Sequence, residues 1–101
     1  MGAPIVVVVE ETERRVKISG EIDMSSAPSM VDAVLRSRSA ELDLSGVTFI
    51  DSTGLHALIR LRADRRSLRI VALSPVVQRL LDITNMREHL LADQPTQSAG
   101  I

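Results

Sequence analysis

Apolar residues follow two different periodicities along this chain of 101 residues, and the two alternate. Continuous or alternating apolar runs predict strands, whereas apolar residues spaced three and four apart predict helices. The order of these patterns predicts β-β-α-β-α-β-α, with a short last strand as an optional addition. Strands that are joined through helices pair in parallel by right-handed crossovers, and only the opening hairpin pairs antiparallel. The sequence therefore predicts a single α/β domain with a small mixed β-sheet and three or more helices.

Short apolar runs bounded by turn residues predict the strands. Their predicted ranges are 5–10, 14–19, 40–44, 68–73 and, for the optional last strand, 89–92. We expect Gly20 to end the second strand and the pair Ser45-Gly46 to break the third, because glycine and serine are typical of turns.

Serine residues before apolar stripes predict where two of the helices begin. Ser25 and Ser26 are candidate N-caps of the first helix. The apolar stripe of that helix comprises Ala27, Met30, Val31, Val34 and Leu35. Ser74 and Pro75 predict the start of the third helix, because serine is a good cap and proline loses no hydrogen bond at the first helical position. Asn85 suits the left-handed cap that ends this helix.

The segment Asp51-Ser52-Thr53-Gly54-Leu55 joins the third strand to a second helix, which is predicted over about residues 53–66. A hydroxyl at such a junction lies beside backbone N–H groups that have no partner within the helix. These donors and the positive end of the helix dipole favour a nearby anion, including phosphate. The purely structural alternative is that Ser52 or Thr53 caps the helix.

The composition indicates a cytoplasmic protein with an aliphatic core. Hydrophobic residues make up 45% of the chain, but Phe49 is its only aromatic residue. The absence of cysteine and of a signal-like N-terminus suits a reducing compartment. A net charge of −1 does not attract nucleic acid, and no apolar segment approaches the roughly 18 residues of a membrane span. We expect one domain over residues 1–93 and a disordered, polar tail over residues 94–101.

Residue types that perform catalysis or hold metals are present without the arrangement that these functions need. Asp51, Ser52 and His56 match the members of a hydrolase triad, but an adjacent aspartate and serine cannot readily place an imidazole between them. His56 and His89 are the only histidines and have no companion at metal-ligand spacing. The chain also has no glycine-rich nucleotide loop. We therefore expect no enzymatic activity, catalytic residue, metal or cofactor.

Arginines cluster on and after the second predicted helix. They are Arg60, Arg62, Arg65, Arg66 and Arg69. A solvated helix end with an Arg60–Asp64 pair explains the cluster without further function. Arg62 falls within the apolar stripe, so its stem should cover the core while its head reaches water. Nucleic-acid binding is disfavoured because no aromatic residues interleave with the arginines, and an acidic protein partner is favoured over it.

Acidic residues follow the second strand much as Ser52 follows the third. Glu21 and Asp23 lie in the segment that leads into the first helix. In open α/β sheets, functional residues collect beyond the carboxyl ends of parallel strands. We expect this acidic loop to border the same end of the sheet as Ser52. The alternative is a charged loop without a further role.

Three segments resemble the anti-sigma factor antagonist, or anti-anti-sigma factor, family, which consists of small proteins made of a STAS domain. They are Gly20-Glu21-Ile22-Asp23, the stretch 42–55 that ends in Asp51-Ser52-Thr53-Gly54-Leu55, and Ser74-Pro75-Val76-Val77-Gln78-Arg79-Leu80-Leu81. The similarity covers roughly residues 5–92 in the order and spacing of elements. It is specific because a strand precedes the central motif and a helix follows it.

The resemblance implies partner switching in transcription regulation. Proteins of this family bind an anti-sigma factor that is also a serine kinase, and this binding releases the sigma factor. The kinase phosphorylates the serine after the motif aspartate, here Ser52, and a serine phosphatase removes the phosphate. The implied partner-binding residues are Asp23, Asp51, Ser52, Thr53, Gly54, Leu55 and His56. A non-switching STAS scaffold, or a ligand-sensing module of a multi-protein complex, is the alternative function.

This chain departs from the family pattern in two places. His56 stands where relatives often carry a small residue, and on a helix it projects near the side of Ser52. A bulky imidazole there would alter the choice of partner, and a protonated one would favour the phosphorylated state. An exposed histidine without a role is the alternative. The chain also lacks a clear final helix after His89.

Overall fold

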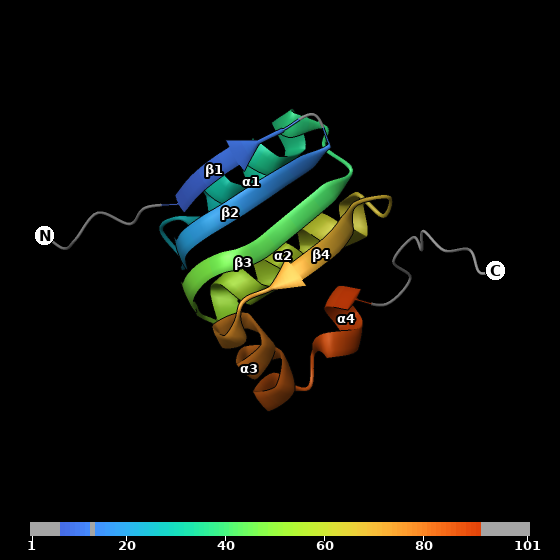
Figure 1. The fold of residues 1–101 in the computed structure, drawn as a ribbon. Coiled ribbons are helices and arrows are strands. Elements are labelled where there is room, and N and C mark those ends of the chain that lie inside the picture. Colours follow the sequence, from blue (N-terminus) through green and yellow to red (C-terminus); the bar gives the residue numbers. More distant parts are fainter. Residues whose placement is uncertain (1–6, 13, 92–101) are drawn as a thin grey trace, which may run out of the picture.

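The first seven elements of the computed structural model follow the order that the sequence predicts (Figure 1). The structure describes residues 7–12 and 14–91. Its elements are, in chain order, β1 (Val7–Glu11), β2 (Arg15–Ile22), α1 (Ala27–Ser37), β3 (Glu41–Ile50), α2 (Ser52–Asp64), β4 (Arg69–Leu73), α3 (Pro75–Thr84) and α4 (Arg87–Leu91). The predicted mixed α/β architecture is confirmed, but the optional last element is a helix.

The strands form one mixed sheet in the order β1-β2-β3-β4. β1 and β2 are antiparallel, whereas β2, β3 and β4 run parallel, as predicted. Figure 1 shows α1 and α2 side by side behind the sheet, with α3 and α4 beyond β4. The carboxyl ends of β2 and β3 therefore lie together, next to the starts of α1 and α2.

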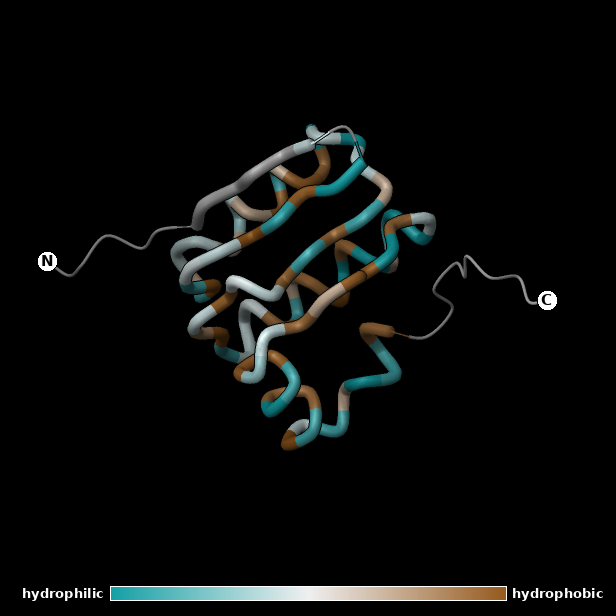
Figure 2. Tube along the Cα trace, in the orientation of Figure 1, coloured by the Kyte–Doolittle hydropathy of each residue, from teal (hydrophilic) through white to brown (hydrophobic). Residues whose placement is uncertain are grey.

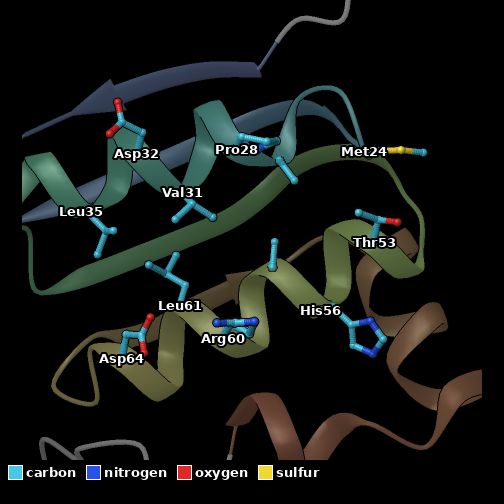
Figure 3. Close-up of a pocket in the computed structure, with 12 residues that line it drawn as sticks. Met24, Pro28, Val31, Asp32, Leu35, Thr53, His56, Arg60, Leu61 and Asp64 are labelled. Carbon is cyan, nitrogen blue, oxygen red and sulfur yellow. The ribbon is translucent and has the colours of Figure 1, made fainter.

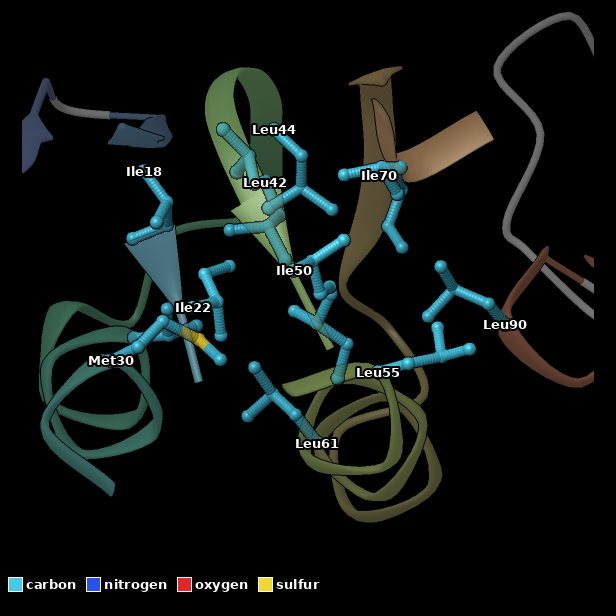
Figure 4. Packing of buried hydrophobic residues seen from close by; sticks show 14 of the residues in the cluster. Ile18, Ile22, Met30, Leu42, Leu44, Ile50, Leu55, Leu61, Ile70 and Leu90 are labelled. Atoms are coloured by element: carbon cyan, nitrogen blue, oxygen red, sulfur yellow. The ribbon is translucent and has the colours of Figure 1, made fainter. Parts of the chain in front are cut away.

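Aliphatic side chains fill the space between the sheet and the two helices behind it. Figure 4 shows Ile22 of β2, Met30 of α1 and Leu61 of α2 pointing toward a shared interior. Hydrophobic residues recur along both strands and helices between hydrophilic stretches (Figure 2). Burying one leucine or isoleucine side chain stabilises a fold by about 1.5–3 kcal/mol, so this layer holds the helices on the sheet. Phe49 remains 45% exposed, and the core is aliphatic as predicted.

β2 and β3 continue past the glycines at which we expected them to end, so these two predicted ends are wrong. Gly20 lies inside β2 with φ of 103°, and Gly46 lies inside β3. Gly46 pairs with Ser19 beside a register irregularity, and a Cβ atom at Gly46 would overlap the Ser19 side chain. The glycines absorb these irregularities, and the strands stay paired up to Ile22 and Ile50. Tertiary pairing thus outweighs the local turn signal.

Both predicted ends of α3 are confirmed. The Ser74 hydroxyl accepts a hydrogen bond from the Val77 N–H at 3.4 Å, and Pro75 is the first helical residue. Asn85 takes the left-handed conformation with φ of 61°, and its N–H donates to the Asp82 carbonyl at 3.3 Å. The predicted strand over 68–73 is also confirmed to within one residue, as β4.

The start of α1 is confirmed in position, because Ser26, one of the two predicted candidates, is the N-cap residue. Its side chain, however, makes no capping hydrogen bond. Of the predicted apolar stripe, Ala27, Met30 and Val34 are buried, whereas Leu35 is 45% exposed. The hydroxyl that we expected to cap α1 is instead used within the loop that precedes the helix.

The last element is α4, so the strand predicted over 89–92 is wrong. Leu90 is buried in the core, and the Arg62 Nε donates to the Leu90 carbonyl at 3.2 Å. Contact with α2 therefore holds α4 in place, and a local apolar pattern does not reveal such a contact. Residue 92 and the predicted tail over residues 94–101 lie outside the described residues.

Candidate functional site

The ends of β2 and β3 bring two loops together. Ile22 and Ile50 are register partners, and the Asp51 N–H donates to the Ile22 carbonyl at 3.3 Å. The loop containing Asp23 thereby lies beside the start of α2. This confirms the expectation that the acidic loop and Ser52 border the same end of the sheet. The prediction that Glu21 belongs to this loop is wrong, because β2 extends to Ile22 and contains Glu21, which is exposed.

Asp51 caps α2. Its backbone is extended, with φ of −109° and ψ of −176°, and its Oδ1 accepts a hydrogen bond from the Gly54 N–H at 2.8 Å. The Asp51 carbonyl accepts the Leu55 N–H at 2.9 Å, which is the first bond of the helix. The alternative in which Ser52 or Thr53 caps the helix is therefore wrong, because β3 extends to Ile50 and leaves Asp51 in the N-cap position.

The capping by Asp51 leaves the two hydroxyl residues that follow it on the surface. Ser52 is the first residue of α2, and both it and Thr53 are exposed. Within the described part of the chain, the Ser52 hydroxyl makes no hydrogen bond. Ser52 thus presents a hydroxyl that the fold does not use. It lies at the start of α2, which other residues hold in place.

Gly54 and Leu55 lie beneath this surface. A Cβ atom at Gly54 would overlap the Ile22 carbonyl oxygen and would lie 2.8 Å from the Ile22 Cγ2. Leu55 is only 2% exposed and belongs to the core. Since neither side chain position is open to a partner, both residues act by holding the start of α2 against the end of β2.

Asp23 organises the loop before α1. Its Oδ1 accepts hydrogen bonds from the Ser25 hydroxyl at 2.8 Å, the Ser25 N–H at 2.9 Å and the Ser26 N–H at 3.1 Å. The Ser25 hydroxyl is the main cause of a lowered pKa of the Asp23 carboxyl, with smaller contributions from the two N–H groups. Asp23 is therefore an ionised group with a structural task, beside Ser52.

A groove of about 630 Å³ separates α1 from α2 (Figure 3). It begins near Ser52, where Met24, Thr53 and His56 line it. Its remaining lining residues are Ala27, Pro28, Val31, Asp32, Leu35, Ala57, Arg60, Leu61 and Asp64. Met24 is 72% exposed at this end. The sequence pattern does not indicate a site at Met24, because the groove exists only where the two helices lie side by side.

The arginine cluster is largely part of the scaffold. Arg62 is 5% exposed and donates to the carbonyls of Leu90 and Arg66, so the expectation that its head reaches water is wrong. Arg65 donates to the Val34 carbonyl at 2.7 Å, and Arg69 pairs with a β3 carboxylate at 2.6 Å. The guanidinium groups of Arg62, Arg65 and Arg69 are therefore bonded within the fold.

In residues 7–12 and 14–91, no three histidine, aspartate or glutamate side chains gather as they would around a metal ion. No helix in these ranges is long and apolar enough to cross a membrane.

Known proteins resemble the chain over most of its length. Residues 4–99 match the family model of the STAS domain. An anti-sigma-B factor antagonist of Bacillus subtilis (strain 168) is 33% identical over 98 residues, which are 89% of this chain and 88% of that protein. An anti-sigma-B factor antagonist of Staphylococcus epidermidis is 24% identical over 106 residues, which are 96% of this chain and 98% of that protein.

Solved structures share the fold. The crystal structure of an anti-sigma factor antagonist from Mycobacterium paratuberculosis superposes with a TM-score of 0.64 and 30% identity, covering 97% of this chain and 93% of that one. The unphosphorylated form of the antagonist SpoIIAA gives a TM-score of 0.58 at 16% identity, covering 92% and 90%. The match of residues 4–99 and the 33% identical relative establish that the chain belongs to the STAS domain family.

Proposed function

We propose that this chain is an anti-sigma factor antagonist whose binding to an anti-sigma factor is switched off by phosphorylation of Ser52. The anti-sigma factor is a serine kinase, its capture releases a sigma factor, and a serine phosphatase restores the antagonist. The observation that carries the proposal is that Asp51 caps α2 and leaves the exposed Ser52 hydroxyl without a structural task. The relatives that are named anti-sigma-B factor antagonists support the class of partner.

The surroundings of Ser52 suit an acceptor of phosphate. Its side chain is exposed, so a kinase can reach it, and the cap and the close packing of Gly54 on Ile22 hold its backbone. A rigid, exposed hydroxyl can be presented to another protein's active site in one orientation. The exposed members of the predicted partner surface are Ser52, Thr53 and His56.

Phosphorylation would act on the partner rather than on the fold. It adds about −1.5 to −2 charges beside the carboxylates of Asp51 and Asp23. A partner surface that fits a neutral hydroxyl then meets added bulk and negative charge. A loss of roughly 3–4 kcal/mol in binding free energy weakens affinity by a few hundredfold to nearly a thousandfold, which is enough for a switch.

The proposal is tested by incubating the purified chain with ATP and the anti-sigma kinase encoded nearest to its gene. Intact-mass measurement should show one added phosphate, which Ser52→Ala abolishes. Thr53→Ala is the matched control, because it removes the neighbouring exposed hydroxyl and should leave phosphorylation unchanged. An unchanged mass together with no complex would refute the proposal. Equal partner affinity of Ser52→Asp and Ser52→Ala would instead indicate a non-switching scaffold.

A further inference from the structure

We infer that His56 is the cationic partner of a phosphate on Ser52. In this role it lowers the pH at which the phosphate becomes doubly charged. The inference rests on the proposed function, since it concerns the phosphorylated form of Ser52. His56 is exposed and has no hydrogen bond or ion pair within the described residues. It is therefore available to a new group on its own helix.

The helix geometry places the two side chains together. Ser52 and His56 are four residues apart in α2, so they occupy neighbouring positions on one face. Side chains of a helix tilt toward its N-terminus, which carries the imidazole toward Ser52. Figure 3 shows the His56 ring leaning toward the end of α2 at which Thr53 lies. A phosphate lengthens the Ser52 side chain and so brings negative charge within reach of a side chain one turn further along the helix.

The start of α2 cannot hold the phosphate as fully as an open helix terminus would. The Asp51 carboxylate already accepts the Gly54 N–H, which would otherwise be a free donor at the helix start. A phosphate on Ser52 would also lie beside the negative charge of Asp51. A cation within one turn of Ser52 would offset the repulsion between the phosphate and Asp51, and His56 stands there.

The other charged groups around the groove do not take this place. Arg60 lies one further turn along α2, away from Ser52. On α1, Asp32 pairs with Arg36 at 3.1 Å, and the carboxylate of Asp23 before α1 is held by serines. α4 meets α2 near Arg62, at the far end of the helix from Ser52. On β3, Glu41 and Asp43 contact Arg15 at the start of the strands.

The second ionisation of a phosphoserine lies near pH 6. A cationic imidazole beside the phosphate favours its doubly charged form, because opposite charges at short distance favour ionisation. The phosphate should therefore reach its doubly charged form at a lower pH when His56 is present than when a neutral side chain replaces it.

The test is a phosphorus NMR titration of the chain with genetically encoded phosphoserine at position 52. In His56→Gln the phosphate midpoint should rise by a few tenths of a pH unit, about 0.2–0.7, as expected for an exposed ion pair. His56→Lys restores a cation and should restore the low midpoint. His89→Gln, which removes the other histidine, is the matched control and should leave the midpoint unchanged.

Equal midpoints in the parent protein and His56→Gln would overturn the inference, as would an equal shift in His89→Gln. Because the phosphoserine is encoded, the titration requires no kinase. A shifted midpoint together with a failed kinase reaction would refute the proposed function and leave the pairing of His56 with the phosphate in place.

Discussion

Two strand-to-helix junctions lie side by side at one end of the sheet, and they use the same residue types differently. Before α1, Asp23 and Ser26 bond within the loop: the Ser26 hydroxyl donates to the Glu21 carbonyl at 2.6 Å and accepts the Asp23 N–H at 3.0 Å. Ser26 is 4% exposed. The Ser26 hydroxyl therefore ties the loop to the end of β2.

Before α2, the aspartate itself is the N-cap, and the serine is the first helical residue. Asp51 binds the Gly54 N–H, while the Ser52 side chain is exposed. The role of a serine at such a junction therefore depends on which residue occupies the N-cap position of the helix. A shift of one residue along the chain separates the buried, hydrogen-bonded hydroxyl of Ser26 from the exposed hydroxyl of Ser52.

The largest expected difference between the junctions concerns the third helical residue of each. Gly54→Ala places a Cβ atom on the Ile22 carbonyl, which is backbone and cannot move without shifting β2. We expect a loss of about 1–3 kcal/mol in the free energy of unfolding. Ser29→Ala, at the matching position of α1, should change it by less than about 0.5 kcal/mol, because Ser29 is exposed. Urea unfolding of both variants measures the two free energies. Equal values would show that the close contact of Gly54 with Ile22 does not hold α2 against β2.

The two serines should also differ when each is replaced. Ser26→Ala leaves the Asp23 N–H and the Glu21 carbonyl without their partner and should cost about 1–3 kcal/mol. Ser52→Ala should change stability by less than about 0.5 kcal/mol. Thermal unfolding of the pair distinguishes them. A Ser52→Ala variant as unstable as Ser26→Ala would contradict the claim that the fold does not use the Ser52 hydroxyl.

Removal of the cap should have a smaller effect. Asp51→Ala should cost about 1 kcal/mol, whereas Asp51→Asn keeps an oxygen for the Gly54 N–H and should cost only a few tenths. Denaturant unfolding measures both. If Asp51→Ala were as stable as the parent, the carboxylate would not be the cap, and the assignment of roles at this junction would fail.

The smallest effect is the pH dependence that Asp23 contributes. Hydrogen bonds from Ser25 and Ser26 lower the pKa of this carboxyl in the folded state. The ionised form therefore adds stability above the ordinary value near 3.9, and this is lost as pH falls through the folded value. Asp23→Asn should flatten the curve of stability against pH below about pH 4. Parallel curves for the two proteins would contradict this role.

The sequence predicted elements well where the signals were local. Ser74, Pro75 and Asn85 mark the ends of α3 by their own conformational preferences, and these ends are confirmed. The order of the elements followed from periodicity alone. The strand ends predicted at Gly20 and Gly46 were wrong, because the effect of a glycine there depends on the pairing between β2 and β3. No local sequence pattern contains that pairing.

The sequence predicted that the loop containing Asp23 and the start of α2 lie together, but it did not predict which residue caps the helix and which are buried. Asp51 and Ser52 are both good N-cap residues, and only the extension of β3 to Ile50 decides between them. The buried positions of Gly54 and Leu55, and the groove beside Met24, follow from the packing of α2 on β2 and α1. Such contacts join segments far apart in the chain, so the sequence pattern did not reveal them.

The most direct test of the central claim compares the affinity of the anti-sigma kinase for the chain with serine and with encoded phosphoserine at position 52. Calorimetry at one pH gives both dissociation constants, and an amide NMR spectrum of each form checks that the fold is retained. We predict an unchanged fold and binding weakened by a few hundredfold to nearly a thousandfold. Equal affinities, or a fold lost on phosphorylation, would contradict the account.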